Sequence, residues 1–431
     1  MKNSKPNKIF ANTNDNNKNK INNKTKSRSQ SKKDDKKYYK NSDSDKNESI
    51  LSFDKSYLED YFTKYYPSNL IIKWLGRNDV NKLKRREFVF VLSNGKYKRY
   101  QSFSTLNSFK NKIKEFLPYK IDIGAIYNIE PKKHSPNGLQ KYEAQERELI
   151  FDIDIIDYNY RTCCEGNTIC QKCWKFIIIA AKILERILKE DFGYEKIFYT
   201  FSGRRGIHCW VNDLIARTLN DARREAILNY IKYIAVDDIN YENLKKVFCI
   251  PVHPSYLSAV SVAKNYFFEV LNEQKILETD KGKELLLKII KLYFGIFDYT
   301  RIERILKNNK KNSGEKFKEV EKELKKCQQI LESNLDTNTF STESCINEFI
   351  LSLLYPKLDA NVTTQTSHLL KSPFSIHEST GNIAVPMSME QLENFSFENI
   401  PNIKNIIEGD IKNKERFNDY LKFFEKFVEN L

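Results

Sequence analysis

The sequence predicts an α/β (α+β) protein with a mixed β-sheet core and a helical insert. Three observations support this class. Runs of alternating apolar and polar residues predict strands between residues 86 and 211. Helical periodicity replaces that alternation between about 235 and 350. Four cysteines gathered between Cys163 and Cys173 interrupt the strand region. With 431 residues the chain is long enough for one domain with its own core and a smaller second part.

The N-terminal region, residues 1–48, is predicted to be a disordered basic tail. It is rich in Asn and Lys and almost devoid of apolar residues, so it cannot bury enough surface to fold. A basic localisation or nucleic-acid-binding arm is the alternative interpretation. The tail holds much of the formal charge of +15, and the excess left for the remainder is modest. Net charge alone therefore identifies no partner.

The first strands are predicted between residues 86 and 127. Segments 86–92 and 97–102 flank Asn94-Gly95, a dipeptide typical of a hairpin turn. Residues 119–127 read as a further strand.

An aspartate-bearing strand follows at Phe151-Asp152-Ile153-Asp154-Ile155. Alternation puts the apolar side chains on one face and both carboxylates on the other. Two carboxylates at this spacing can share a divalent cation, and oxygen ligands favour Mg²⁺ or Mn²⁺. The alternative is the solvated face of an antiparallel sheet.

The cysteine knuckle, residues 163–173, contains Cys163, Cys164, Cys170 and Cys173. This spacing is dense enough to hold one tetrahedral Zn²⁺. A disulfide cluster would require an oxidising compartment, and the N-terminus carries no apolar signal segment. We therefore expect zinc, and thiolate-only ligands indicate a structural site. No apolar run is long enough to cross a bilayer.

After the knuckle we expect a helix over 174–190, strands over 196–201 and 207–211, and a helix from about 221 towards 234. The turn between the two strands reads Ser202-Gly203-Arg204-Arg205-Gly206. Its guanidinium groups, hydroxyl and glycines suit phosphate oxygens, although a solvated loop is the alternative.

The C-terminal half is predicted to return to the core after the insert. Residues 235–351 form the helical insert, with an amphipathic stripe at Val320, Leu324, Cys327 and Leu331. Strands are expected over 373–377 and 382–385, and a final helix over 416–431. The core domain is therefore discontinuous, spanning 49–234 and 352–431.

Together these motifs resemble the small, catalytic subunit of archaeo-eukaryotic DNA primase in its eukaryotic form. The residues that carry the resemblance are REF (86–88), RYQSF (99–103), PYKIDIGAIY (118–127), FDIDIIDY (151–158), CCEGNTICQKCW (163–174), SGRRGIHCW (202–210) and LLKSPFSIH (369–377). They occur in the family order.

The resemblance implies template-directed synthesis of short RNA primers from NTPs on single-stranded DNA, by two-metal-ion nucleotidyl transfer. It implies two catalytic Mg²⁺ or Mn²⁺ ions and one structural Zn²⁺. The catalytic and cation-binding positions it implies are Glu87, Asp152, Asp154 and Asp359, with a less direct role for Glu87. The nucleotide-binding positions it implies are Arg99, Lys120, Asp122, Ser202, Gly203, Arg204, Arg205, Gly206, His208, His368, Lys371 and His377.

The implied partners are the primase large subunit in a heterodimer, the catalytic and accessory subunits of DNA polymerase alpha, the single-stranded template and the RNA–DNA primer duplex. The implied location is the nucleus, and no membrane is involved. Two other hypotheses stay open. One is a non-catalytic nucleic-acid-binding subunit that kept the knuckle. The other is a two-metal nucleotidyltransferase that extends existing DNA ends in repair.

Overall fold

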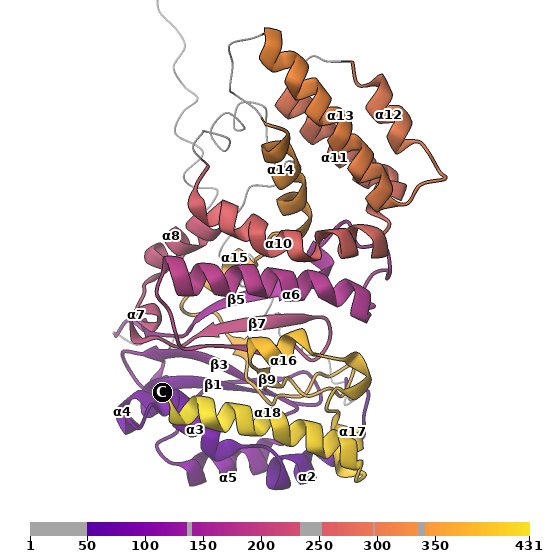
Figure 1. Cartoon of the computed structure of the whole chain (residues 1–431). Coiled ribbons are helices and arrows are strands. Elements are labelled where there is room, and N and C mark those ends of the chain that lie inside the picture. Colours follow the sequence, from indigo (N-terminus) through magenta and orange to yellow (C-terminus); the bar gives the residue numbers. More distant parts are fainter. Residues whose placement is uncertain (1–49, 136–139, 233–251, 296–297, 335–340) are drawn as a thin grey trace, which may run out of the picture. The chain divides into compact units, whose positions relative to one another are not determined.

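The computed structural model describes residues 50–135, 140–232, 252–295, 298–334 and 341–431. The predicted tail and the first part of the predicted insert lie outside these ranges. The α/β class expected from the sequence is confirmed in the described residues, where helices surround two β-sheets (Figure 1).

Both sheets are antiparallel. The first has the strand order β2-β1-β3-β4, and β8 also pairs with β3. The second has the order β5-β7-β6-β9. Their bounds are β1 Arg86–Val91, β2 Tyr97–Gln101, β3 Lys120–Tyr127, β4 Ala144–Glu146, β5 Leu149–Asp154, β6 Ile197–Phe201, β7 Gly206–Val211, β8 Leu370–Lys371 and β9 Pro386–Met387.

Helices occupy most of the remaining described sequence. They are α2 Tyr57–Lys64, α3 Ser68–Gly76, α4 Val80–Arg85, α5 Leu106–Phe116, α6 Gln171–Arg186, α7 Leu214–Arg217, α8 Asp221–Ile231, α10 Pro254–Glu273, α11 Asp280–Phe294, α12 Thr300–Leu306, α13 Ser313–Asn334, α14 Thr342–Leu354, α15 Ala360–Thr364, α16 Met389–Glu393, α17 Ile403–Ile407 and α18 Ile411–Glu429. None of the helices in the described ranges has the length and apolar character needed to span a bilayer.

The second sheet has one face on α6 and the other on α3 and α18. On the first face Tyr199 donates a hydrogen bond to the backbone of α6. On the second face Phe198 and Trp210 meet Trp74 of α3 and Phe424 of α18 in edge-to-face contacts. Because strand side chains alternate between faces, this packing fixes which residues of β5 and β7 point away from α6.

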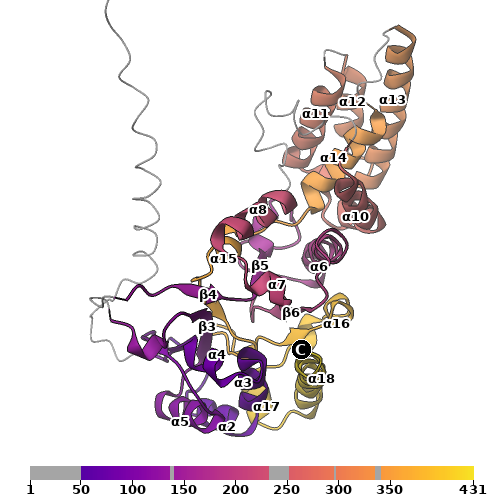
Figure 2. The same cartoon turned by 90° about the vertical axis from the view of Figure 1, so that its left-hand side faces the viewer.

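The region between 254 and 354 is helical wherever it is described. Helix α10 packs against α6, α14 packs beside α10 and also contacts α6, and α11–α13 lie farther from both sheets in both views (Figures 1 and 2). Val320, Leu324 and Cys327 of α13 are buried, so the predicted apolar stripe is a packed face. The division into a discontinuous core domain and an insert stays a prediction.

The predicted strands 373–377 and 382–385 are wrong. These segments pair through one isolated bridge, Ile376 to Ile383, while regular strands form beside them as β8 and β9. Phe374 has a φ of 64°, which breaks an extended run, and Pro373 has no N–H to donate. Two helices also begin earlier than predicted, α6 at Gln171 and α18 at Ile411.

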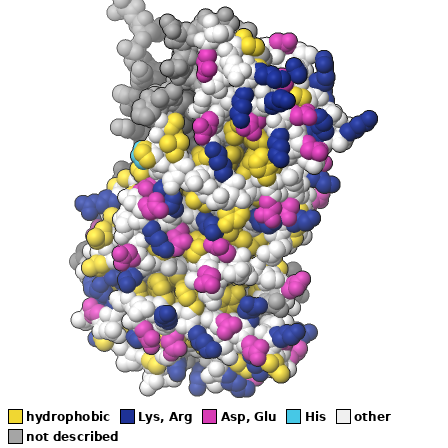
Figure 3. Space-filling view, viewed as in Figure 1, with side chains coloured by type: hydrophobic (Ala, Val, Ile, Leu, Met, Phe, Trp, Pro, Cys, Tyr) yellow, Lys and Arg dark blue, Asp and Glu magenta, His cyan; other side chains and the backbone are white. Residues whose placement is uncertain are grey.

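The surface carries both signs of charge. On the face drawn in Figure 3, Lys and Arg side chains alternate with Asp and Glu over most of the molecule, and a group of Lys and Arg lies over α11–α13. This distribution agrees with the modest net charge of the sequence outside the tail.

Candidate active site

The pairing of β5 with β7 places the two strand aspartates beside the turn 202–206. Asp152 is opposite His208, and Asp154 is opposite Gly206. The Asp152 Oδ1 atom lies 3.8 Å from His208 Nε2. A Cβ at Gly206 would lie 2.5 Å from the Ile153 carbonyl oxygen, so only glycine fits opposite Asp154.

Asp359 lies beside the same strand, although in sequence it follows the whole helical region 254–354. It is the N-cap of α15, and its side chain accepts a hydrogen bond from the Asn361 N–H at 2.9 Å. The Asp359 backbone N–H donates to the Asp152 carbonyl at 3.2 Å. The structure therefore brings Asp152, Asp154 and Asp359 together at the end of β5.

The carboxylates at this point repel one another. Burial raises the pKa of Asp152 to about 7, and the charges of Asp154, Asp359 and Asp157 add to the effect, while Arg205 opposes it. Burial and the charges of Asp154 and Asp359 also raise the pKa of Asp157. A group of this kind is stabilised by a bound cation, and its all-oxygen donors suit Mg²⁺ or Mn²⁺.

A hollow of about 780 Å³ opens beside Asp359. Its lining combines Asp157 and Lys357 with Asp221 and Glu225 of α8. The carboxylate group therefore has open space next to it.

The turn 202–206 joins β6 to β7 and faces the carboxylates through Arg205. The Arg205 Nε donates to both Asp154 carboxylate oxygens, at 2.9 and 2.8 Å, and its Nη1 contacts Asn167 of the knuckle. The turn is closed by the Ser202 hydroxyl, which accepts from the Gly206 N–H at 3.1 Å. Arg204 forms no ion pair with any residue in the described ranges.

Gly203 lets this turn approach the segment that carries His377. Its φ is +92°, and a Cβ there would lie 2.7 Å from the His377 Cβ. The Gly203 carbonyl accepts hydrogen bonds from the Thr380 hydroxyl at 2.8 Å and the Asn382 amide at 3.2 Å. Burial and Lys371 lower the pKa of His377 to about 4.

Strand β8 brings Lys371 to the same turn. Lys371 is opposite Asp122 of β3, and its Nζ donates to the Ser202 carbonyl at 3.0 Å. Burial and the charge of Lys120 lower the pKa of Lys371 to about 8. Lys120 itself pairs with Asp122 at 3.2 Å.

Two buried polar atoms at this site have no hydrogen-bond partner in the described residues. They are Nδ1 of His208 and Oδ1 of Asp122. Burial, with the charges of Lys371, Lys120 and His368, lowers the pKa of His208 to about 3, so the imidazole is neutral. Buried polar groups without a partner are typical of a binding site, where a ligand supplies the missing bonds.

Glu87 and Arg99 form a separate pair on the first sheet. The Arg99 Nη2 lies 3.1 Å from Oε1 of Glu87, whose carboxylate is fully buried. The same oxygen accepts from the Tyr100 N–H at 3.3 Å, and Tyr100 has a φ of 57°. The Glu87 carboxylate therefore contacts both the Arg99 guanidinium and the backbone of Tyr100, which has a positive φ.

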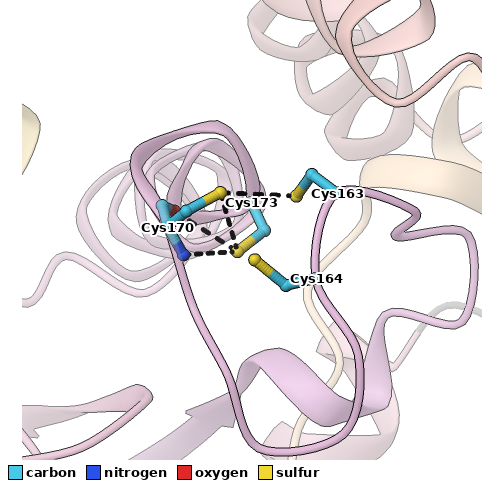
Figure 4. A group of neighbouring side chains, drawn as sticks. All are labelled: Cys163, Cys164, Cys170 and Cys173. Atoms are coloured by element: carbon cyan, nitrogen blue, oxygen red, sulfur yellow. Dashed lines mark hydrogen bonds between the residues drawn. The ribbon is translucent and has the colours of Figure 1, made fainter.

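The cysteine knuckle closes around its four thiols (Figure 4). The four Sγ atoms lie within 4.8 Å of one another, and in the described ranges no other His, Cys, Asp or Glu group is so compact. Cys163 and Cys164 come from the loop, and Cys170 and Cys173 from the start of α6. Burial raises the pKa of Cys170, but hydrogen bonds from backbone N–H groups and neighbouring thiols outweigh it and bring it to about 7.

Sequence reasoning missed several residues that contact this site. Asp157 belongs to the quoted motif 151–158, but it lies beyond the predicted strand and was not assigned to the site; the chain turns there at η2, Ile155–Asp157. Asn167 and Asn382 carry no sequence pattern of their own. They reach the turn 202–206 only through the tertiary fold.

Comparisons with known proteins agree with these motifs. The family described as DNA primase small subunit matches residues 151–389. The DNA primase small subunit of Saccharomyces cerevisiae is 35% identical over 394 residues, covering 87% of this chain and 91% of that protein. The Caenorhabditis elegans DNA primase small subunit is 31% identical over 410 residues, covering 85% and 95%. The DNA primase small subunit PriS of Thermococcus kodakarensis is 28% identical over 349 residues, covering 77% and 88%.

A solved structure, the polymerase domain of Mycobacterium tuberculosis ligase D in complex with DNA, covers 82% of this chain and 89% of its own. At 12% identity and a TM-score of 0.31, this likeness supports no argument.

Proposed function

The chain belongs to the DNA primase small subunit family, and from that premise we propose that it is the catalytic subunit of a DNA primase. It joins ribonucleoside triphosphates into short RNA primers on a single-stranded DNA template. The observation that carries the proposal is the convergence of Asp152, Asp154 and Asp359 beside the turn 202–206. There the Asp359 N–H bonds to the Asp152 carbonyl, and Arg205 pairs with Asp154.

The three carboxylates are the proposed ligands of two divalent cations, Mg²⁺ or Mn²⁺. The oxygen donors and the raised pKa of Asp152 fit such cations, because a positive charge relieves the repulsion among the carboxylates. When bound by these carboxylates, such cations would lower the pKa of an attacking hydroxyl and neutralise a leaving pyrophosphate. The residues of the chain would hold the attacking hydroxyl and the nucleoside triphosphate in line for the transfer.

The proposed triphosphate cradle consists of the turn 202–206 with Lys371, His208 and His377. Arg204 offers a guanidinium that carries no ion pair among the described residues, and glycines allow backbone N–H groups to approach phosphate oxygens. Arg205 is shared between the cradle and Asp154, so it links triphosphate binding to the carboxylates. His208 is neutral and offers a ring N–H to a ligand oxygen.

A second group of residues is proposed to contact the nucleoside. Asp122 has a buried oxygen without a partner, which can accept a hydrogen bond from a ribose hydroxyl. Lys120 neutralises the other oxygen of the same carboxylate. Arg99 and His368 lie on the first sheet and before β8, and we assign them supporting contacts. Glu87 is proposed to act by orienting Arg99.

The cysteine knuckle is proposed to hold one Zn²⁺ through four thiolates. The compact set of soft donors fits this ion and leaves no ligand position for a substrate. The role of the ion is structural. It would fix the loop between β5 and α6, whose residue Asn167 contacts Arg205.

The proposed partners follow from membership of the family. A small subunit implies a large primase subunit, with which the chain would form a heterodimer, and a single-stranded DNA template, on which the RNA primer would form an RNA–DNA duplex. We further propose assembly with the catalytic and accessory subunits of DNA polymerase alpha, and a nuclear location. The helical region 254–354 is the proposed candidate for protein docking.

The experiment that tests this function is primer synthesis by the purified protein on poly-dT with ATP and Mn²⁺. De novo oligoadenylates are the expected product, and Asp152→Asn protein is the control for contaminating polymerases. Extension of a supplied primer without de novo products would indicate an end-extending enzyme. No product, with or without the large subunit, would indicate a non-catalytic binding subunit and overturn the proposal.

A further inference from the structure

A fully buried glutamine from the helical region reaches into the cysteine knuckle. Gln274 follows directly after α10 and is 0% exposed. Its Oε1 accepts hydrogen bonds from the backbone N–H groups of Thr162 at 2.9 Å and Cys163 at 3.3 Å. Its Nε2 lies 3.4 Å from the Cys163 Sγ. The Gln274 side chain, from a distant part of the sequence, therefore contacts both the backbone N–H and the sulfur of the proposed metal ligand Cys163.

The hydrogen bonds themselves fix the orientation of this amide. Oxygen is the only atom of the amide that can accept the two backbone N–H groups, so the NH₂ group must face the sulfur. An N–H donor directed at sulfur stabilises the negatively charged thiolate more than the neutral thiol. The thiolate is the form that binds a metal ion.

The chain around Gln274 is shaped for this contact. Lys275 has a φ of 49°, and the backbone turns there from α10 into η5, Ile276–Glu278. The Thr162 hydroxyl donates to the Gln274 carbonyl. On the other side of the knuckle, Lys175 of α6 pairs with Glu273 at 2.9 Å. The end of α10 therefore contacts a residue that precedes the four cysteines in sequence and a residue that follows them.

We propose that Gln274 is a positioning residue of the zinc site. Its amide aligns Cys163 and stabilises the thiolate, so that zinc in the knuckle and the turn after α10 stabilise each other. Partners behind the ligands are part of many metal sites, where their loss lowers metal affinity about 10- to 100-fold. The inference rests on the zinc assigned under the proposed function. It adds to that site a residue outside the cysteine segment 163–173.

Substitution of Gln274 by glutamate distinguishes the proposed contact with the thiolate from a role limited to accepting the backbone N–H groups. A carboxylate still accepts the two N–H groups of Thr162 and Cys163, but it has no donor for sulfur and adds a negative charge beside the thiolate. We expect Gln274→Glu protein to release zinc to a chromogenic chelator about tenfold faster than wild type or more. A merely structural glutamine would leave the release rate unchanged.

The matched control is Gln171→Glu. Gln171 adjoins Cys170 in sequence, but it is exposed and its amide donates to the Phe395 carbonyl instead of a thiol. It should release zinc at the wild-type rate, and equal acceleration in both variants would overturn the proposal by indicating a general charge effect. Gln274→Met, which adds no charge, is measured alongside and should also release zinc faster.

A measurement on the wild-type protein keeps the proposal testable if the variants do not fold. Chelation should raise hydrogen–deuterium exchange of backbone amides in residues 270–279, which lie outside the knuckle. Unchanged exchange there would overturn the coupling. Zinc content is measured first. Purified wild-type protein without zinc contradicts the proposed cofactor, whereas zinc-loaded protein that is indifferent to Gln274 contradicts this inference alone.

Discussion

The carboxylate group and the cysteine knuckle are both suited to cations, but they are built in opposite ways. The four thiols come from one short loop and the start of α6, and they are surrounded by N–H donors from the backbone and Gln274. Two of the carboxylates belong to β5, and the third, Asp359, follows the helical region 254–354 in sequence. The positive charge beside them is that of Arg205, which pairs with Asp154. The thiols are thus brought together within one short segment, with Gln274 as a contact from distant sequence, whereas the three carboxylates themselves meet only through the tertiary fold.

The difference suits the two proposed tasks. Asp359 is exposed and adjoins the hollow, which is an open route for the proposed cations and substrates. The repulsion that raises the pKa of Asp152 to about 7 is tolerated because surrounding packing holds β5 in place. The knuckle is closed by its four thiols, which leave no free ligand position for a substrate. Loss of a carboxylate should therefore affect activity, and loss of a thiol should affect stability.

The largest effect should follow from Asp152→Asn. This change keeps the shape but removes a cation ligand, so primer synthesis on poly-dT should fall roughly a thousandfold or more. Stability should stay equal or rise, because the change also removes a charge that Asp154 and Asp359 repel. The control is Asp157→Asn, because Asp157 is an exposed neighbour that we do not assign as a ligand. Its primer synthesis should fall about threefold at most. A lower melting temperature for Asp152→Asn would show that this carboxylate stabilises the fold, which contradicts the contrast with the cysteine knuckle.

Cys170→Ser should have the second largest effect, on stability. Loss of one thiolate should remove zinc and lower the melting temperature by roughly 5–10 °C, for a cost on the order of 3 kcal/mol. Cys327→Ser is the control, since Cys327 is buried in α13 away from the cluster. It should keep its zinc whatever its melting temperature. A Cys170→Ser protein that loses zinc yet melts like wild type would refute the structural role of the metal.

The same contrast explains which parts the sequence predicted. The aspartate strand, the hairpin and the knuckle depend on neighbours in sequence, and alternation or spacing revealed them. The pairing of Lys371 with Asp122 and the position of Gln274 depend on contacts between distant segments, for which a single sequence carries no pattern. The resemblance to a known family supplied Lys371, and nothing supplied Gln274.

The strand prediction at 373–377 failed for a related reason. Its apolar residues Phe374 and Ile376 are buried as the pattern predicts, but Ser375 between them is buried too. The backbone nevertheless turns at Phe374 so that its N–H reaches the Ala384 carbonyl at 2.7 Å. The sequence therefore predicted that the apolar residues are buried, but it predicted neither the burial of Ser375 nor the conformation of the backbone.

Arg204→Ala should have a smaller effect than either of these changes. Arg204 has no ion pair among the described residues, so its removal should mainly weaken triphosphate binding. We expect KM for ATP to rise about tenfold, or about 1.4 kcal/mol, with little change in kcat. Arg205→Ala should also lower kcat, because Arg205 contacts Asp154. Arg223→Ala, an exposed arginine of α8, is the control and should change neither constant.

The smallest expected effect is a pH dependence of substrate binding through Lys371. Its pKa is lowered to about 8 by burial and by Lys120, so the proposed phosphate contact loses its charge as the pH rises through that value. KM for ATP should increase roughly fivefold between pH 7 and pH 9. Lys371→Arg keeps a positive charge throughout this range, so its KM should be flat with pH even if it is higher overall.

The stability of the substrate-free protein should change with pH in the opposite sense. Between about pH 8 and the ordinary lysine pKa of 10.5, Lys371 is already neutral in the folded chain but still protonated in the unfolded chain. The unfolded state then binds more protons, so the contribution of Lys371 to the free energy of unfolding rises with pH. Lys371→Met should remove this rise, measured by denaturant unfolding at pH 7.5 and pH 10. An unchanged slope in the variant would show that Lys371 carries an ordinary pKa and does not supply the pH dependence of KM.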